Sequence, residues 1–234
     1  MVSGFSRTVI ADRPREDRHE PLLSAAFALK CALGFTLRGM IDPAPADPIA
    51  HFSTLYKQAA QTQAEPDATV LSTVDPDGRP SGRYVLLKNV DARGFVFFTN
   101  LGSRKARALE ANRFGALTFY WPPETQVRIE GTVEPVTPAE ADAYFATRPR
   151  EFQIGAWASS QSDPLDSRSA LDARVREAAA KFAAGAAVTR PPFWSGYRLV
   201  PDRIEFWTRD PHRLHDRVFY ERRNGQWARS FLFP

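Results

Sequence analysis

The segment Ser103-Arg104-Lys105 combines a hydroxyl group and two cations where a strand gives way to a helix. It follows Thr99-Asn-Leu-Gly102, so backbone N–H groups at the start of the helix could converge with these side chains on one spot. Cations at this end of a helix oppose its macrodipole, which favours an anion nearby. The pattern predicts a phosphate site, with solvated first-turn residues as the open alternative.

Two further basic residues, Arg83 and Lys88, enclose the apolar stretch Tyr-Val-Leu-Leu. Because five positions separate them, they point to opposite faces of a strand, and each could serve one side of a site. Charges at the ends of an apolar strand can also simply reach water. Both interpretations stay open on these residues alone.

A third group follows the stretch Ile204-Glu-Phe-Trp207 and consists of Trp207, Arg213, His215 and Arg217, all within eleven positions. An aromatic plate, two guanidinium groups and an imidazole suit a flat anionic heterocycle. In a strand, Arg213 and His215 would share one side and Leu214 would face the interior, although the stretch could also be a turn. His215 on its own could equally be structural.

Composition limits the class of protein. With 234 residues, 43% of them hydrophobic, the chain can form one sizeable globular domain with appendages. A net charge of +4 without a basic stripe does not indicate nucleic-acid binding. One cysteine and four histidines supply neither an internal disulfide nor a four-ligand zinc site, so we expect no metal and a reducing, cytoplasmic location. The sequence contains no GxGxxG, GxxxxGK[ST], HExxH or GxSxG motif.

The elements that must position these residues are short strands joined by turns. Asp47 and Pro48 predict the start of a helix, and Asn224-Gly225 predicts a tight hairpin. Further helices are expected over 103–112, 137–146 and 167–185, the last being the longest. Strands are expected over 68–74, 83–90, 95–100, 116–121, 126–136, 197–200, 203–207, 218–222 and 227–232. The pattern favours a mainly β, α+β fold: an antiparallel barrel with peripheral helices.

The first 46 residues differ from the rest. An apolar stretch from Leu22 to Leu37 is interrupted by Lys30 and is too short to span a bilayer, so no membrane is expected. The acidic residues before it do not suit a secretory signal. We therefore predict a flexible tail over residues 1–46 and one domain over residues 47–234.

Several motifs occur in order between about Asp47 and Pro234. They are Arg83-Tyr-Val-Leu-Leu-Lys88, Phe97-Phe-Thr-Asn-Leu-Gly-Ser-Arg-Lys105, Gln126-Val-Arg-Ile-Glu-Gly131, Tyr144-Phe-Ala-Thr-Arg-Pro-Arg150, Gln153-Ile-Gly-Ala-Trp-Ala-Ser-Ser-Gln-Ser162, Ile204-Glu-Phe-Trp207 and His212-Arg-Leu-His-Asp-Arg217. Together they resemble the pyridoxamine (pyridoxine) 5′-phosphate oxidase family. The resemblance implies an FMN-binding split barrel that works as a homodimer with two flavin sites at the subunit interface.

The resemblance also implies which residues bind the flavin. It places Arg83, Arg104 and Lys105 around the FMN phosphate and ribityl chain, with Gln161 and Ser162 coming from the other subunit. The flavin ring would be bound by Gln126, Trp207 and Arg217. The implied cofactor-binding set is completed by Tyr84, Val85, Leu86, Leu87, Lys88, Phe98 and Thr99.

The implied substrates are pyridoxamine and pyridoxine 5′-phosphates, which are oxidised to pyridoxal 5′-phosphate with oxygen as acceptor. Lys88, Tyr144 and Arg148 would bind the substrate phosphate. Arg213 and His215 would be the catalytic pair at the pyridine ring and the reacting carbon. The hydride chemistry itself would belong to the flavin.

Two departures from the family pattern keep alternatives open. Phe152 stands where the family usually has a small hydroxyl residue, and the segment from Arg38 lacks the tyrosine of a lid that closes over the substrate. One alternative is a split-barrel oxidase with another substrate, as in phenazine biosynthesis. The other is a flavin-binding protein without turnover.

Overall fold

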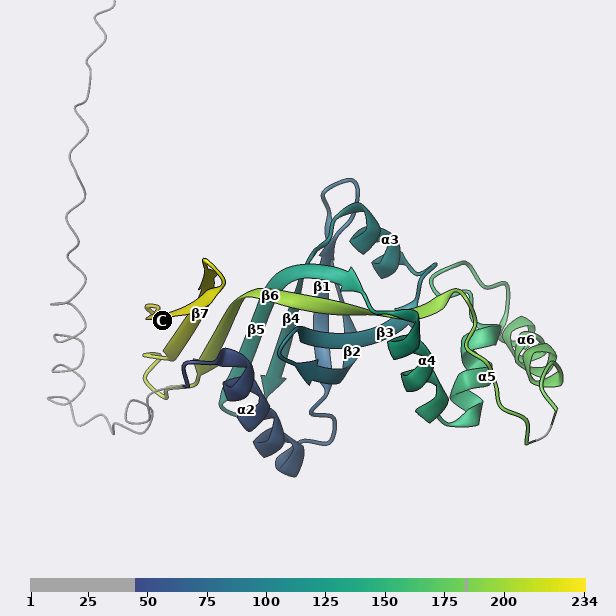
Figure 1. Ribbon diagram of the computed structural model, residues 1–234, viewed down its shortest axis with the longest axis horizontal. Helices are drawn as coiled ribbons and strands as arrows, with labels where there is room; N and C mark the ends of the chain where they lie inside the picture. The colour runs from purple at the N-terminus through teal and green to yellow at the C-terminus, as the bar shows by residue number, and fades with distance from the viewer. Residues whose placement is uncertain (1–44, 184) are drawn as a thin grey trace, which may run out of the picture. The chain divides into compact units, whose positions relative to one another are not determined.

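A computed structural model describes residues 45–183 and 185–234, so the predictions of a flexible tail and of an altered lid lie outside the described residues except at 45 and 46. The described chain contains eight strands and five helices (Figure 1). The strands are β1 (Ala68–Val74), β2 (Pro80–Asp91), β3 (Gly94–Asn100), β4 (Phe114–Trp121), β5 (Thr125–Pro135), β6 (Trp194–Thr208), β7 (Asp216–Arg223) and β8 (Gln226–Phe231). The helices are α2 (Pro48–Thr62), α3 (Arg104–Ala111), α4 (Pro138–Thr147), α5 (Arg150–Ala158) and α6 (Arg168–Ala180).

The strands form one antiparallel sheet in the order β3-β2-β1-β4-β5-β6-β7-β8, and β6 also pairs with β3. This second pairing closes six strands into a barrel, while β7 and β8 extend the sheet beyond it. The predicted antiparallel split barrel with peripheral helices is therefore confirmed. The Asn224-Gly225 hairpin is confirmed as well, and both of its residues adopt positive φ, as this tight turn requires.

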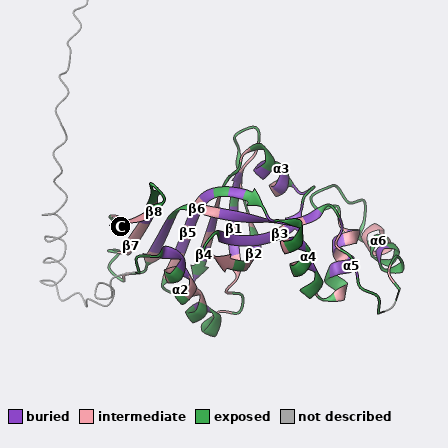
Figure 2. Cartoon of the chain, in the orientation of Figure 1, coloured by how far each residue is buried: buried purple, intermediate pink, exposed green. Residues whose placement is uncertain are grey.

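The barrel interior is filled by alternate side chains of its strands and by one helix. The side chain of Asp47 caps α2 by accepting a 2.8 Å hydrogen bond from the backbone N–H of Ile49, as predicted. Phe52 of α2 is fully buried, and its ring lies 4.9 Å from that of Phe95 and 5.1 Å from that of Phe119. Figure 2 shows the buried residues concentrated on the barrel strands. The helix thus packs against the barrel and fills its core.

Strand β6 differs from the prediction, which broke it at Pro201-Asp202. It runs without interruption for 15 residues. The register with β5 shifts between Glu130 and Gly131, so that Pro201 lies opposite Gly131 at a β-bulge and the strand continues past the proline. A Cβ on Gly131 would lie 2.0 Å from the carbonyl oxygen of Val200. Glycine is therefore required where the two backbones approach.

One helix was missed by the sequence analysis, and another ends earlier than predicted. Helix α5 was not predicted, since Pro149 at its N-cap makes no side-chain capping bond that a sequence pattern could reveal. Helix α6 ends at Ala180 rather than Gly185 and is shorter than α2, because the next residues form a turn. The Arg150 guanidinium binds the carbonyl oxygens of Phe182 and Ala183 in that turn and so ties α5 to the end of α6.

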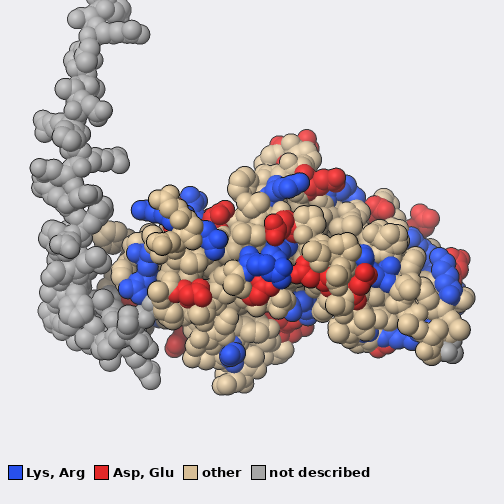
Figure 3. Space-filling model, viewed as in Figure 1, with Lys and Arg blue, Asp and Glu red and all other residues tan. Residues whose placement is uncertain are grey.

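The surface charges, the helix lengths and the possible metal ligands give no sign of a charged patch on the face in view, or of a membrane-spanning helix or a metal site in the described residues. On the face in Figure 3, basic and acidic side chains are interleaved over the described residues. No described helix is both long and apolar enough to cross a membrane. Within the same ranges, no group of three or more His, Cys, Asp or Glu residues is placed to hold a metal ion.

Candidate active site

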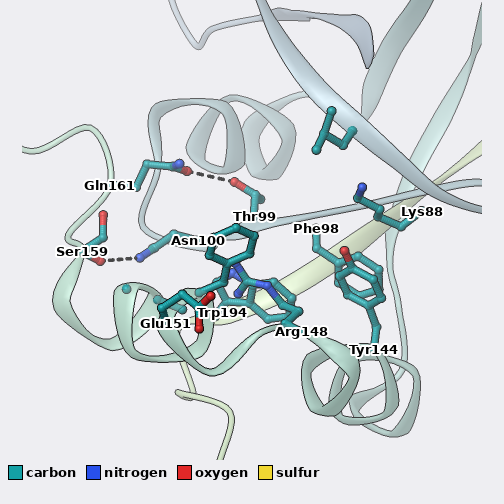
Figure 4. A pocket seen from close by; sticks show the side chains of 14 residues that line it. Lys88, Phe98, Thr99, Asn100, Tyr144, Arg148, Glu151, Ser159, Gln161 and Trp194 are labelled. Atoms are coloured by element: carbon teal, nitrogen blue, oxygen red, sulfur yellow. Dashed lines mark hydrogen bonds between the residues drawn. The ribbon is translucent and has the colours of Figure 1, made fainter. Parts of the chain in front are cut away.

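A pocket of about 440 Å³ opens beside the carboxyl end of β3, between β2 and helices α4 and α5 (Figure 4). Residues implied by the sequence resemblance make up half of its lining: Leu86, Lys88, Phe98, Thr99, Tyr144, Arg148 and Gln161. Phe152, noted as a departure, also lines it. The residues that sequence reasoning missed are Asn100, Glu151, Gly155, Ala156, Ser159 and Trp194.

Three cations, Arg83, Arg104 and Lys105, lie near one another, and Lys105 contacts Thr99 and Gln161 of the pocket lining. Arg83 donates to the carbonyl oxygen of Leu71 at 3.0 Å and to Thr73 Oγ1 at 2.7 Å. Burial, and then the neighbouring charge of Arg83, lower the pKa of Lys105 to about 8. Burial and the nearby Arg104 lower the pKa of Arg83 in turn. The Asp75 carboxylate, 3.6 Å from Arg104, offsets part of this positive charge, and the mutual repulsion of the remaining cations favours an anion at the cluster.

Gln161 and Ser162 lie against this cation cluster within a single chain. The Lys105 ammonium donates to Gln161 Oε1 at 2.8 Å and to Thr99 Oγ1 at 3.1 Å, and the Arg104 backbone N–H donates to Ser162 Oγ at 3.1 Å. The expectation that Gln161 and Ser162 come from the other subunit is therefore wrong. Sequence motifs carry no information on which chain closes a contact, and the segment after α5 returns to the start of α3.

Ser103, expected to offer its hydroxyl to the phosphate, is fully buried and caps α3 instead. Its Oγ accepts a hydrogen bond from the backbone N–H of Ala106 at 3.3 Å. The anion donors at this helix start are therefore the two cationic side chains and the backbone.

A second basic group lies on the α4 side of the pocket. Lys88 forms a 2.7 Å ion pair with Asp67, and the guanidinium carbon of Arg148 lies 4.8 Å from the ring centre of Trp194. Burial lowers the pKa of Arg148. Tyr144 stacks on Phe98 with ring centres 4.1 Å apart. Lys88, Tyr144 and Arg148, which the resemblance groups together, thus line one pocket next to the cation cluster.

Strand β2 presents the rest of the implied cofactor-binding stretch. Val85 and Leu87 are buried in the barrel core, whereas the side chain of Tyr84 is 76% exposed and that of Leu86 is 44% exposed. Only backbone atoms of Val85 and Leu87 remain to meet a ligand. Within the stretch Tyr84 to Leu87, the accessible side chains are therefore those of Tyr84 and Leu86.

A third group of predicted residues lies together on β5, β6 and β7. Trp207 pairs with Gln126 on one side and with Arg217 on the other. The ring centres of Trp207 and His215 are 4.5 Å apart. His215 Nδ1 accepts a 3.1 Å hydrogen bond from the backbone N–H of Asp210, so the neutral imidazole carries its proton on Nε2.

Arg213 lies in a turn rather than a strand, with φ at 68° and its N–H donating to the carbonyl oxygen of Asp210. The turn, which the sequence left open as the alternative to a strand, is the conformation found, and Leu214 is accordingly 38% exposed instead of facing the interior. The turn forms because the Asp210 side chain accepts hydrogen bonds from the N–H groups of His212 and Leu214. Arg213 is exposed beside His215.

Arg217 is held by a buried carboxylate. Its Nε donates to Glu205 Oε1 at 2.7 Å, and Arg128 approaches the other oxygen of Glu205 at 3.3 Å. The Glu205 side chain is only 7% exposed, and its hydrogen bond raises the pKa of Arg217. The direction of the Arg217 guanidinium is thus fixed from within the sheet.

The third group is remote from the first two within one chain. Thr99, beside the cation cluster, pairs with Ser195 near the start of β6, whereas Trp207 lies near the end of the same strand. Trp207 is twelve positions beyond Ser195, which corresponds to roughly 40 Å of path along the strand. A single chain therefore carries two separate parts of a site.

The closed six-stranded antiparallel barrel with peripheral helices places the chain in the split-barrel class of folds. Residues 55–182 match the family described as "Pyridoxamine 5'-phosphate oxidase", and residues 194–234 match the "Pyridoxine 5'-phosphate oxidase C-terminal dimerisation region". The chain belongs to the pyridoxamine 5′-phosphate oxidase family.

Curated relatives agree with this assignment. A pyridoxine/pyridoxamine 5′-phosphate oxidase of Myxococcus xanthus is 54% identical over 214 residues, covering 90% of this chain and 96% of the relative. One of Caulobacter vibrioides is 54% identical over 190 residues, covering 80% of this chain and 85% of the relative.

Solved structures share the fold. PhzG from Burkholderia lata 383, in complex with tetrahydrophenazine-1-carboxylic acid, is 36% identical with a TM-score of 0.77, covering 82% of this chain and 95% of that one. A pyridoxamine 5′-phosphate oxidase-related, FMN-binding protein from Nostoc punctiforme is 16% identical with a TM-score of 0.65, covering 81% and 100%. The second likeness concerns the fold alone.

Proposed function

We propose that this chain is an FMN-dependent oxidase that converts pyridoxamine or pyridoxine 5′-phosphate to pyridoxal 5′-phosphate in the cytoplasm, with oxygen as acceptor. The observation that carries the proposal is a pair of anion-binding groups beside one pocket. The cluster of Arg83, Arg104 and Lys105 suits the flavin phosphate, and Lys88 with Arg148 suits the substrate phosphate. The names of relatives 54% identical to the chain support the same reaction.

The residues present fit FMN. The amine of Lys105 is buried enough for its pKa to fall to about 8, and its hydrogen-bond partners are the neutral side chains of Thr99 and Gln161. A phosphate dianion would relieve this cost by pairing with the ammonium. Lys105, Arg83 and Arg104 would hold the phosphate, and Gln126, Trp207 and Arg217 would hold the ring.

The complete site would need two chains. Thr99, in the phosphate-binding group, pairs with Ser195, which is twelve positions before Trp207 on β6. Because of this separation, Gln126, Trp207 and Arg217 of one subunit would meet the phosphate-binding group of the other subunit. The match of residues 194–234 to a dimerisation region supports a homodimer, since these residues include Trp207, Arg213, His215 and Arg217. Each dimer would then carry two equivalent sites.

The protein groups would bind and orient, and bound FMN would supply the hydride acceptor that oxygen then reoxidises. Lys88, Tyr144 and Arg148 would fix the substrate by its phosphate. His215 Nε2–H would donate to the reacting end of the substrate, and Arg213 would hold its anionic ring oxygen. Trp207 would cover the ring and exclude water.

A split-barrel oxidase with another substrate is the second candidate. Phe152 favours it, because a half-exposed phenyl ring lines the pocket where a hydroxyl donor would otherwise serve the phosphate. The 36% identity to PhzG supplies a precedent of different ligand chemistry on this fold. Lys88 and Arg148 in the same pocket argue for a phosphorylated substrate.

The deciding experiment is steady-state oxidation of pyridoxamine and pyridoxine 5′-phosphates by the purified dimer, with hydrogen peroxide and bound flavin measured in parallel. We expect a yellow protein with one FMN per subunit and peroxide formed in step with aldehyde. Bound flavin without turnover of either substrate would overturn the proposed reaction. Full flavin retention after Arg104→Ala with Lys105→Ala would overturn the cofactor site, and an active, flavin-loaded monomer in light scattering would overturn the shared site.

A further inference from the structure

Trp194, the first residue of β6, contacts both an aromatic ring and a guanidinium group in the pocket of Figure 4. Its ring lies 5.3 Å from that of Phe98 at an interplanar angle of 5°, and 4.8 Å from the guanidinium carbon of Arg148. Tyr144 extends the stack on Phe98. Gly196 makes room for this arrangement, because a Cβ there would lie 2.6 Å from the Phe98 ring.

The side chain of Arg148 is held in place without an ion pair to any carboxylate that the structure describes. Its NH1 is buried and has no hydrogen-bond partner among the described residues. No ion pair joins Arg148 to a carboxylate in the described part of the chain, although Glu151 lines the same pocket. A buried guanidinium donor without a partner is costly, so its direction needs an explanation.

The aromatic ring supplies that explanation. A guanidinium over the face of Trp is attracted by the ring quadrupole, and this contact uses none of its N–H donors. A carboxylate would also fix the group, but it would occupy the donors and offset the positive charge. The Trp194 ring, with a second contact from Phe145 at 5.7 Å, therefore holds Arg148 without placing a competing acceptor on its N–H groups.

We propose that Trp194 is a positioning residue that holds Arg148 ready for the phosphate of the substrate. This inference rests on the proposed function, which assigns Arg148 to that phosphate. Trp194 acts through Arg148 and does not touch the reacting carbon. Its loss should raise the KM for the phosphorylated substrate and leave kcat and bound FMN nearly unchanged.

The test is a double-mutant cycle with Trp194→Leu, Arg148→Ala and the double variant, each assayed as the flavin-loaded dimer with pyridoxine 5′-phosphate. We expect Trp194→Leu to raise KM about tenfold, within the range of a desolvated cation–π contact. In the Arg148→Ala background the same change should have almost no further effect on KM. Trp194→Phe keeps an aromatic face and should recover most of the loss.

The matched control is Trp157→Phe, because Trp157 is partly buried and packs against the same hydrophobic cluster of α4, α5 and α6 to which Trp194 belongs. Trp157 packs on Phe182 and Phe193 and donates to the carbonyl oxygen of Thr189, away from Arg148. The KM of the Trp157→Phe variant for pyridoxine 5′-phosphate should stay at the wild-type value.

Additive KM effects of Trp194→Leu and Arg148→Ala would overturn the positioning role, as would an unchanged KM in Trp194→Leu. If Trp194→Leu does not fold, Trp194→Phe decides in the same cycle: its smaller KM change must also vanish in the Arg148→Ala background. An unchanged KM in Arg148→Ala itself would instead refute the phosphate assignment of the proposed function. The two failures are thus distinguishable.

Discussion

The affinity of the protein for FMN should fall as the pH rises through 8, because Lys105 must be charged to bind the phosphate. Burial and the charge of Arg83 lower the pKa of this lysine to about 8 in the flavin-free protein. A bound dianion favours the ammonium form and raises that pKa, so binding takes up a proton. Affinity is therefore full below pH 8 and is lost above it.

The magnitude follows from the protonated fractions. The phosphate of FMN is a dianion throughout this range, since the second pKa of a phosphate ester is about 6. The arginines of the cluster stay charged. If only the ammonium form binds, a pKa of about 8 makes the dissociation constant about tenfold larger at pH 9 than at pH 7.

The assay is fluorescence titration of the flavin-free protein with FMN at intervals between pH 7 and pH 9. Lys105→Arg is the matched control, because it keeps a cation that does not titrate here, so its affinity should change little with pH. A flat profile for the wild-type protein would refute the reasoning. An equally steep profile for Lys105→Arg would assign the titration to another group.

Three further variants test other parts of the site. Arg213→Ala should keep its flavin and its dimer while kcat/KM falls by about 10² or more, the range of a positioned polar group; near wild-type turnover would remove Arg213 from the site. Phe152→Ser should lower the KM for the phosphorylated substrate by about tenfold, because a hydroxyl restores one charge-assisted donor; an unchanged KM would mean that Phe152 does not face the phosphate. Glu205→Gln should lower the free energy of unfolding in urea by about 1–3 kcal/mol, because Arg217 loses a buried charged partner. Glu221→Gln, at an exposed pair, is its control and should cost far less.

Local signals predicted most of the fold. The strand over 68–74 agrees with the structure at both ends, and the Thr137 capping box is present as expected. These features depend on side chains a few residues apart. In contrast, the continuity of β6 across Pro201 depends on Gly131 in a neighbouring strand, and α5 begins without a side-chain cap. Contacts that are remote in sequence decide both.

The residues of the candidate site also fall into those that sequence motifs predicted and those that depend on contacts remote in sequence. Motifs placed Arg83, Arg104 and Lys105 together, as the structure does, because two of them are adjacent and the third is on a nearby strand. Trp194 was missed, since its role arises only when β6 pairs with β3 and brings it beside Phe98. A tryptophan two positions after Pro191-Pro192, at the start of an apolar stretch, was the one available signal.

Strand β6 also has a genetic consequence. It carries Trp194 at one end and Trp207 at the other, so in the proposed dimer each strand contributes to both sites. A lesion at either end damages half of every site in a homodimer. When two chains with lesions at opposite ends associate, one site receives both defects and the other receives none. Two inactive alleles of this protein can therefore complement each other within a mixed dimer.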